Sequence, residues 1–258
     1  MTVLDHYRLF TDCSIILKTS ATQESTAMRF KVLRFVLICF LVLKLNGVSF
    51  AALYPEITRF VEQRKGEFDS IPGERKLALS RVADYVSSCI ASGKTARLTF
   101  VCTHNSRRSH LAQVWSQIAA AHYGVRSVET FSGGTKATAL NPRTIAVLQR
   151  SGLKIEVAEP SDTNPRYAIT FQDDGKPLLG FSKVYDAAPN PTTEFCAVMT
   201  CSEADSACPT LPGSDLRVSL PFEDPKTADD TPLEARTYDE RCAQIAREML
   251  YTMSMVRR

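Results

Sequence analysis

The stretch "LTFVCTHNSRRSHLAQVW", residues 98–115, decides the fold class of this chain. Its first four residues, Leu98 to Val101, are apolar except for Thr99 and predict a short buried strand. Cys102 and a run of polar residues follow. Apolar residues then recur at helical spacing up to Gly124, which can end a helix in the left-handed conformation: Leu111, Val114, Trp115 and Ile118. The stretch therefore predicts a buried strand that leads through a polar loop into a helix.

The same order of elements repeats directly downstream. A second strand is predicted at about 127–131, and it ends in the sequence "SGGT". A second helix is predicted up to Gly152, with Asn141 as its N-cap and Pro142 at its first position. Strand, helix, strand and helix in this order indicate a parallel sheet with right-handed crossovers.

The rest of the chain adds a hairpin, two strands and a helix. Alternation around Asp174-Gly175 predicts a β-hairpin insertion at about 165–190. Buried strands are predicted at "FCAVMTC", 195–201, and "LRVSL", 216–220. The last helix is predicted to begin at "TYDE", which reads as a capping box from Thr237, and to bury one stripe: Tyr238, Cys242, Ile245 and Met249. We expect an α/β fold, an open parallel sheet flanked by helices.

Three segments are expected along the chain: an upstream extension with a signal peptide at 1–51, an N-terminal helical segment at 52–95, and the main domain at 96–258. In the helical segment, one face is apolar and Gly93 marks the end: Leu79, Val82, Val86 and Ile90. This segment is expected to pack on the main domain.

A secretion signal is predicted from Met28 to Ala51. Basic residues open it, the apolar stretch Phe35 to Leu43 follows, and small residues stand before a cleavage site after Ala51. The apolar stretch is too short for a comfortable membrane span, so no stable span is expected. The signal favours an exported or periplasmic protein. The alternative is a buried helix or strand in a cytoplasmic protein.

The composition excludes several classes. The chain has 258 residues, 44% apolar and 23% charged, which is typical of a globular domain. A net charge of +3 without basic stripes argues against nucleic-acid binding. The eight cysteines form no CxxC pair and only four histidines are present, so neither a structural zinc site nor another metal or cofactor is expected.

The polar loop predicts an oxyanion site. Ligands of open parallel sheets bind beyond the carboxyl ends of the strands, where loop amides and a helix N-terminus attract anions. Arg108 offers a planar fork of donors, and the same field favours the thiolate of Cys102. Candidate anion-binding residues are Thr103, His104, Asn105, Ser106, Arg107, Arg108 and Ser109. The alternative is a structural cysteine beside a surface arginine.

The sequence "VCTHNSRRS" resembles the phosphate loop of low-molecular-weight tyrosine phosphatases and thioredoxin-coupled arsenate reductases, usually C-x-G-N-x-C-R-S. The resemblance continues through "SGGTKATALNPRTIAVL" and "EDP", and so covers about 96–250. It implies the flavodoxin-like fold of the low-molecular-weight phosphatases. It also implies that Cys102 is the nucleophile, Asn105 organises the loop, Arg108 binds the oxyanion and Ser109 supports the thiolate. His104 replaces the usual glycine, and Arg107 replaces the usual second cysteine and adds positive charge.

The stretch "MTCSEADSACP" resembles the redox segment of the arsenate reductases, typically C-S-x-A-D-x-x-C-P. This resemblance implies a relay in which Cys102 attacks arsenate, Cys201 displaces arsenite, and Cys208 carries the disulfide to the surface. A thioredoxin-like dithiol would then reduce it. A structural disulfide between Cys201 and Cys208 is the alternative, and an oxidising compartment would favour it.

Asp224 in "FEDPKT" resembles the general acid of the same family. Phosphatases often carry tyrosines after this Asp-Pro, whereas this chain has Lys226 and Thr227, which favours the reductase branch. The neighbouring Glu223 is a weaker candidate because it does not precede the proline. A turn-forming aspartate before Pro225 is the alternative.

Three functions follow from these residues. The first is an arsenate reductase of the kind that confers arsenical resistance, with a relay of three cysteines. The second is a phosphatase for phosphotyrosine or small phosphate monoesters, in which Cys201 and Cys208 act as a redox brake. The third is an exported oxyanion-binding module without turnover.

Overall fold

The computed structural model describes residues 52–208 and 210–257 of the chain. The signal peptide and upstream extension predicted at 1–51 lie outside the described residues. Among the helices of the described part, none is both long enough and apolar enough to cross a membrane.

Four parallel strands form the main sheet, in the order β2-β1-β6-β7. They are β1 (Ala96–Cys102), β2 (Val128–Gly134), β6 (Phe195–Met199) and β7 (Ser214–Ser219). The two central strands, β1 and β6, are almost completely buried, as their apolar sequences predict. The predicted open parallel α/β fold is thus confirmed.

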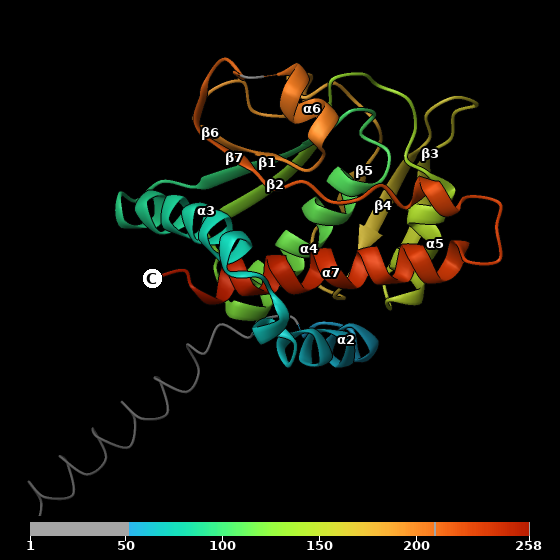
Figure 1. Ribbon diagram of the computed structural model, residues 1–258, viewed down its shortest axis with the longest axis horizontal. Helices are drawn as coiled ribbons and strands as arrows, with labels where there is room; N and C mark the ends of the chain where they lie inside the picture. The colour runs from blue at the N-terminus through green and yellow to red at the C-terminus, as the bar shows by residue number, and fades with distance from the viewer. Residues whose placement is uncertain (1–51, 209, 258) are drawn as a thin grey trace, which may run out of the picture. The chain divides into compact units, whose positions relative to one another are not determined.

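The helices flank this sheet. They are α2 (Pro55–Lys65), α3 (Gly73–Ala91), α4 (Arg108–Tyr123), α5 (Pro142–Arg150), α6 (Ser202–Ala207) and α7 (Glu234–Ser254), with short 3₁₀ turns η1 (Phe68–Ser70) and η2 (Pro225–Ala228). In Figure 1, α7 runs below the sheet, and it packs against α2, α3 and α4. Asn141 caps α5 as predicted, because its side chain accepts the N–H of Arg143 at 2.9 Å.

The predicted start of α7 is wrong. The helix begins at Glu234, three residues before the expected cap. Thr237 lies inside the helix, where its hydroxyl donates to the carbonyl of Leu233 at 2.9 Å, and Glu240 pairs with Arg236. A threonine side chain can bond to a preceding carbonyl within a helix as readily as it can cap one, so the local pattern did not distinguish the two positions.

One apolar core joins the N-terminal helices to the main domain. Trp115 of α4 is fully buried, stacks on Phe60 of α2 with ring centroids 4.8 Å apart, and donates its indole N–H to Cys242 of α7. The apolar stripes predicted for α3 and α7 face this core. The segment at 52–95 is therefore an integral cover of the domain.

A second, antiparallel sheet has the order β3-β4-β5. Its strands are β3 (Lys154–Glu159), β4 (Arg166–Thr170) and β5 (Leu178–Gly180), and the last two form the predicted hairpin. Strand β3 was not predicted from the sequence. Its residues are largely exposed and carry little apolar signal, so its strand conformation depends on pairing with β4.

Candidate active site

The polar loop lies between β1 and α4, at the carboxyl end of a central strand. Cys102 is the last residue of β1, and α4 begins at Arg108. Gly134 of β2 pairs with Cys102, and its backbone lies close to the loop. A Cβ atom on Gly134 would lie 2.8 Å from the amide nitrogen of Asn105 and 2.9 Å from the carbonyl oxygen of Thr103. Only glycine allows this approach, so the "SGG" sequence is part of the site.

A chain of hydrogen bonds leads to the Cys102 sulfur. The Asn105 side-chain amide donates to the Ser109 hydroxyl at 2.9 Å, and that hydroxyl lies 3.1 Å from the sulfur. Because Ser109 accepts from Asn105, its own proton is available to the sulfur. Asn105 adopts a left-handed conformation, with φ of 45°, which asparagine tolerates better than most residues. All three residues are buried.

Carbonyl groups of the loop are hydrogen-bonded to neighbouring backbone, whereas its N–H groups are unpaired among the described residues. The carbonyls of Cys102, Thr103 and Ser106 accept backbone N–H groups from residues 135, 136 and 141. Within the described part of the chain, the N–H groups of residues 103–107 have no acceptor. Consecutive unpaired amides at the start of a helix form a concave site for an anion.

A segment that the sequence analysis left without a role also supports the loop. The Lys183 backbone N–H donates to the Asn105 side chain at 2.9 Å, and the Ser182 hydroxyl donates to the His104 carbonyl at 2.9 Å. Both residues follow the β4–β5 hairpin. The insertion therefore holds the loop through these two hydrogen bonds, and no local motif in "FSKVYD" indicates this contact.

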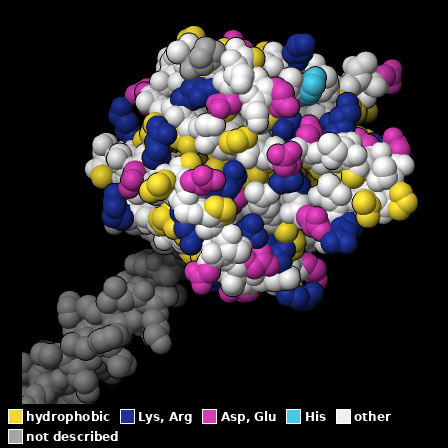
Figure 2. Space-filling model, viewed as in Figure 1, with side chains coloured by type: hydrophobic (Ala, Val, Ile, Leu, Met, Phe, Trp, Pro, Cys, Tyr) yellow, Lys and Arg dark blue, Asp and Glu magenta, His cyan; other side chains and the backbone are white. Residues whose placement is uncertain are grey.

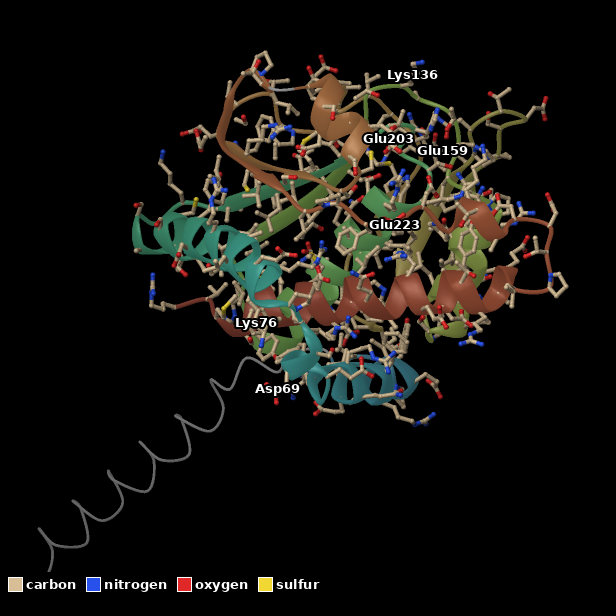
Figure 3. All side chains as sticks on the ribbon, viewed as in Figure 1. Asp69, Lys76, Lys136, Glu159, Glu203 and Glu223 are labelled. Carbon is tan, nitrogen blue, oxygen red and sulfur yellow. The ribbon has the colours of Figure 1, made fainter. Side chains whose placement is uncertain are left out.

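Arg108 and Asp224 form an ion pair at the start of α4. The guanidinium donates to an Asp224 carboxylate oxygen at 2.8 Å and to the Phe222 carbonyl at 3.0 Å. Glu203, labelled in Figure 3 at the end of α6 nearest α4, adds a carboxylate 3.8 Å from the same guanidinium. Asp224 also caps η2 by accepting the N–H of Lys226, so it fulfils the turn role as well. An oxyanion on Arg108 would take the place of the Asp224 carboxylate.

Arg107 does not supply the free positive charge that the sequence analysis added to the loop. Its guanidinium donates to the Tyr238 hydroxyl at 2.7 Å and to the Asp229 carboxylate at 3.0 Å. Burial raises the pKa of Tyr238 to about 12, so its hydroxyl stays protonated and donates to Asp229. The charge of Arg107 is thus balanced by a carboxylate.

Cys201 lies next to the nucleophile loop. Its sulfur is 3.4 Å from the Thr103 hydroxyl and accepts the N–H of Ala204 at 3.4 Å, as the N-cap of α6. Cys102, Cys201 and Cys208 pack in one apolar cluster, in which the first two are buried and Cys208 is half-buried. All three thiols are free. The structure brings the three predicted cysteines together at one edge of the sheet.

Comparison with known proteins assigns the family. A family model described as low molecular weight phosphotyrosine protein phosphatase matches residues 97–169. An arsenate reductase of Brevibacillus brevis is 29% identical over 146 residues, covering 57% of this chain and 88% of the relative. An arsenate reductase of Bacillus cereus (strain AH187) is 30% identical over 127 residues, covering 49% of this chain and 74% of the relative. The chain belongs to the low-molecular-weight protein tyrosine phosphatase and arsenate reductase family.

Both branches of this family are enzymes, and so is this chain. The range matched by the family model contains the loop from Cys102 to Ser109, whereas Cys201, Cys208 and Asp224 lie beyond it. A solved low molecular weight protein tyrosine phosphatase from Bacillus subtilis aligns with 62% of this chain and 96% of its own length, at 13% identity and a TM-score of 0.38. Within the described residues, no group of three or more His, Cys, Asp or Glu side chains is arranged to hold a metal ion.

Charged side chains of both signs are mixed on the face of the molecule shown in Figure 2. Lys and Arg side chains alternate with Asp and Glu over the face shown in Figure 2, in keeping with the small net charge. This face shows no large patch of one sign, and the loop amides and Arg108 supply the short-range attraction for an anion.

Lys183 makes the stability of the protein depend on pH. Burial, with a smaller effect of the Arg166 charge, lowers the pKa of Lys183 from 10.5 to about 8. The unfolded chain therefore binds more protons between these values, and stability rises with pH from about 8 to 10.5. We expect Lys183→Met to raise the free energy of unfolding by about 1–3 kcal/mol at pH 7 and by less at pH 10. Urea unfolding at both pH values measures this, and an equal effect at both would contradict it.

Proposed function

We propose that the protein is an arsenate reductase in which Cys102 is the nucleophile and Cys201 and Cys208 form the redox relay. The observation that carries the proposal is the contact between the Cys201 sulfur and Thr103, the residue after the nucleophile. A second thiol held against the anion loop, with a half-buried third thiol at the end of the same helix, has an evident use in reduction. Hydrolysis of a phosphate ester needs neither.

The first step forms a bond between Cys102 and arsenic. The loop amides and Arg108 hold arsenate, and the Cys102 thiolate attacks the arsenic atom. A hydroxide leaves and takes a proton from Asp224, which acts in its protonated form once the oxyanion has displaced it from Arg108. The product is a thioester-like Cys102–arsenic(V) adduct and water.

The second step transfers two electrons. The Cys201 thiolate attacks the Cys102 sulfur, and the sulfur–arsenic bond breaks with its electron pair remaining on arsenic. Arsenic(V) becomes arsenic(III) and leaves as arsenite, while Cys102 and Cys201 become a disulfide. Burial raises the pKa of Cys201, and the Thr103 and Ala204 contacts oppose this. The raised pKa favours the thiol form of Cys201, so the attacking thiolate is its minor form.

The third step moves the disulfide outward. Cys208 attacks Cys201 and releases Cys102 as a thiolate. Cys201 and Cys208 stand at the two ends of α6, seven residues apart, which corresponds to about 10 Å along a helix. A disulfide needs Cα atoms about 4.4–6.8 Å apart, so α6 has to unwind. A six-residue helix is marginal without its tertiary contacts, which makes this rearrangement feasible.

A thioredoxin-like dithiol is the proposed reductant of the Cys201–Cys208 disulfide. Export of the chain, expected from the segment at 28–51, is part of the same proposal and would require a dithiol donor outside the cytosol. Sequencing the N-terminus of the mature protein tests export: a mature chain that begins at Ala52 supports it, and an intact N-terminus contradicts it.

Phosphatase activity is the second candidate, because the loop, Arg108 and Asp224 would serve a phosphocysteine mechanism equally well. The reduced full-length protein should be assayed with arsenate plus thioredoxin, thioredoxin reductase and NADPH, and in parallel with an aryl phosphate. We expect each enzyme molecule to release many arsenite ions. Hydrolysis without arsenite would assign the phosphatase function, and phosphate binding with neither product would leave an oxyanion-binding module.

A further inference from the structure

Two consecutive arginines of the nucleophile loop bind two carboxylates of one downstream segment. Arg107 pairs with Asp229 at 3.0 Å, and Arg108 pairs with Asp224 at 2.8 Å. The two aspartates flank η2, so this short segment is attached to the loop at both ends. The segment carries Asp224, the group that the proposed function uses as an acid.

The two ion pairs differ in whether they persist when substrate binds. The Arg108 fork has to turn to the bound oxyanion, and its bond to Asp224 is then lost. Arg107 has no such duty, because its donors form a closed triangle with Tyr238 and Asp229: Arg107 to Tyr238 at 2.7 Å, Arg107 to Asp229 at 3.0 Å, and Tyr238 to Asp229 at 2.8 Å. The Arg107 and Asp229 side chains are only 13% and 15% exposed, so solvent screens this pair weakly.

The far side of the segment is held as well. Arg143 of α5 lies 3.7 Å from Asp229 and pairs with Asp230 at 2.6 Å and with Glu234 at 2.7 Å. These partners fix the position of Asp229 relative to α5 and α7. The triangle is therefore a link between the nucleophile loop and a fixed point five residues after Asp224.

We infer that Arg107 is a positioning residue: it ties the segment from Asp224 to Asp229 to the nucleophile loop, so that the acid stays next to this loop when substrate binds Arg108. This inference rests on the proposed role of Asp224. It also explains why an arginine stands where the family usually has a second loop cysteine, since a cysteine could not reach both Asp229 and Tyr238 with hydrogen bonds.

The competing role for Arg107 is direct binding of the oxyanion. The two roles predict opposite effects of removing Asp229. If Arg107 positions Asp224, then Asp229→Ala and Tyr238→Phe should resemble Arg107→Gln. If Arg107 binds the anion, Asp229→Ala should free its guanidinium and strengthen anion binding.

The test compares full-length Arg107→Gln, Asp229→Ala and Tyr238→Phe with Arg150→Gln, which removes an exposed pair with Asp239 away from the site. Thermal unfolding by circular dichroism verifies that each variant is folded. We expect kcat for arsenite formation to fall about 10- to 100-fold in Arg107→Gln and Asp229→Ala, less in Tyr238→Phe, and not in the control. The dissociation constant for inorganic phosphate should change less than about twofold.

A double variant separates positioning from general loss of structure. The double variant Arg107→Gln/Asp224→Asn should be no slower than Asp224→Asn alone, because both changes remove the same contribution. The inference would be overturned if the fold losses in kcat of the two single variants multiplied in the double variant. It would also be overturned if phosphate binding were tenfold weaker in Arg107→Gln and stronger in Asp229→Ala.

Hydrogen exchange tests the link without turnover. The amides of residues 225–231 should exchange faster in Arg107→Gln than in the wild type, most clearly with phosphate bound, when Arg108 is engaged. If the wild type forms no arsenite and hydrolyses no aryl phosphate, the proposed function fails while this measurement still judges the link. Unchanged exchange in Arg107→Gln would reject the link whatever the activity.

Discussion

Replacing Cys102 with serine is expected to abolish arsenite formation and aryl phosphate hydrolysis, by at least about 10⁴-fold, while inorganic phosphate still binds. A serine hydroxyl is not ionised near neutral pH, and Ser109 offers it a donor rather than a base. The loop amides and Arg108 remain in place, so the anion site persists. Initial rates with both substrates and calorimetric titration with phosphate measure the two effects.

Cys89→Ser is the matched control for this substitution. Cys89 is a free, half-buried thiol of α3 and lies outside the apolar cluster that contains Cys102. We expect its loss to leave both activities unchanged. Residual turnover of Cys102→Ser at more than about one hundredth of the wild-type rate would remove the nucleophile from the proposal.

Replacing Cys201 or Cys208 with serine should divide the two activities. Cys201→Ser is expected to form no arsenite, because nothing displaces the Cys102–arsenic adduct, yet to hydrolyse an aryl phosphate at near the wild-type rate. Cys208→Ser should release about one arsenite per enzyme and then stop with a Cys102–Cys201 disulfide. The amount of arsenite released per enzyme molecule measures both outcomes. Mass spectrometry of the enzyme after turnover has stopped identifies the disulfide.

Two results would contradict this division. Repeated turnover by Cys208→Ser would place the end of the relay at Cys201. Equal loss of hydrolysis in Cys201→Ser would show that the thiol supports the loop through Thr103 and Ala204 instead of reacting. Near-ultraviolet circular dichroism of the variant should match the wild type if the reactive role is right.

The sequence by itself determined the α/β class, because buried parallel strands and amphipathic helices carry their own apolar periodicity. It also placed Cys102, Asn105, Arg108 and Ser109 in one loop, since these residues lie within eight positions of one another. Elements with little apolar periodicity could not be predicted from the sequence. Strand β3 is exposed and forms through pairing, and the first turn of α7 carries no capping side chain.

Only the tertiary structure decided which residues serve the loop from a distance. Arg107 meets Tyr238 across 131 positions of sequence and Asp229 across 122, and the Lys183 backbone reaches Asn105 across 78. A local pattern encodes periodicity and turn chemistry, whereas such contacts depend on how sheet and helices pack. The sequence alone suggested that the charge of Arg107 belongs to the anion site, whereas in the fold it pairs with the half-buried carboxylate of Asp229.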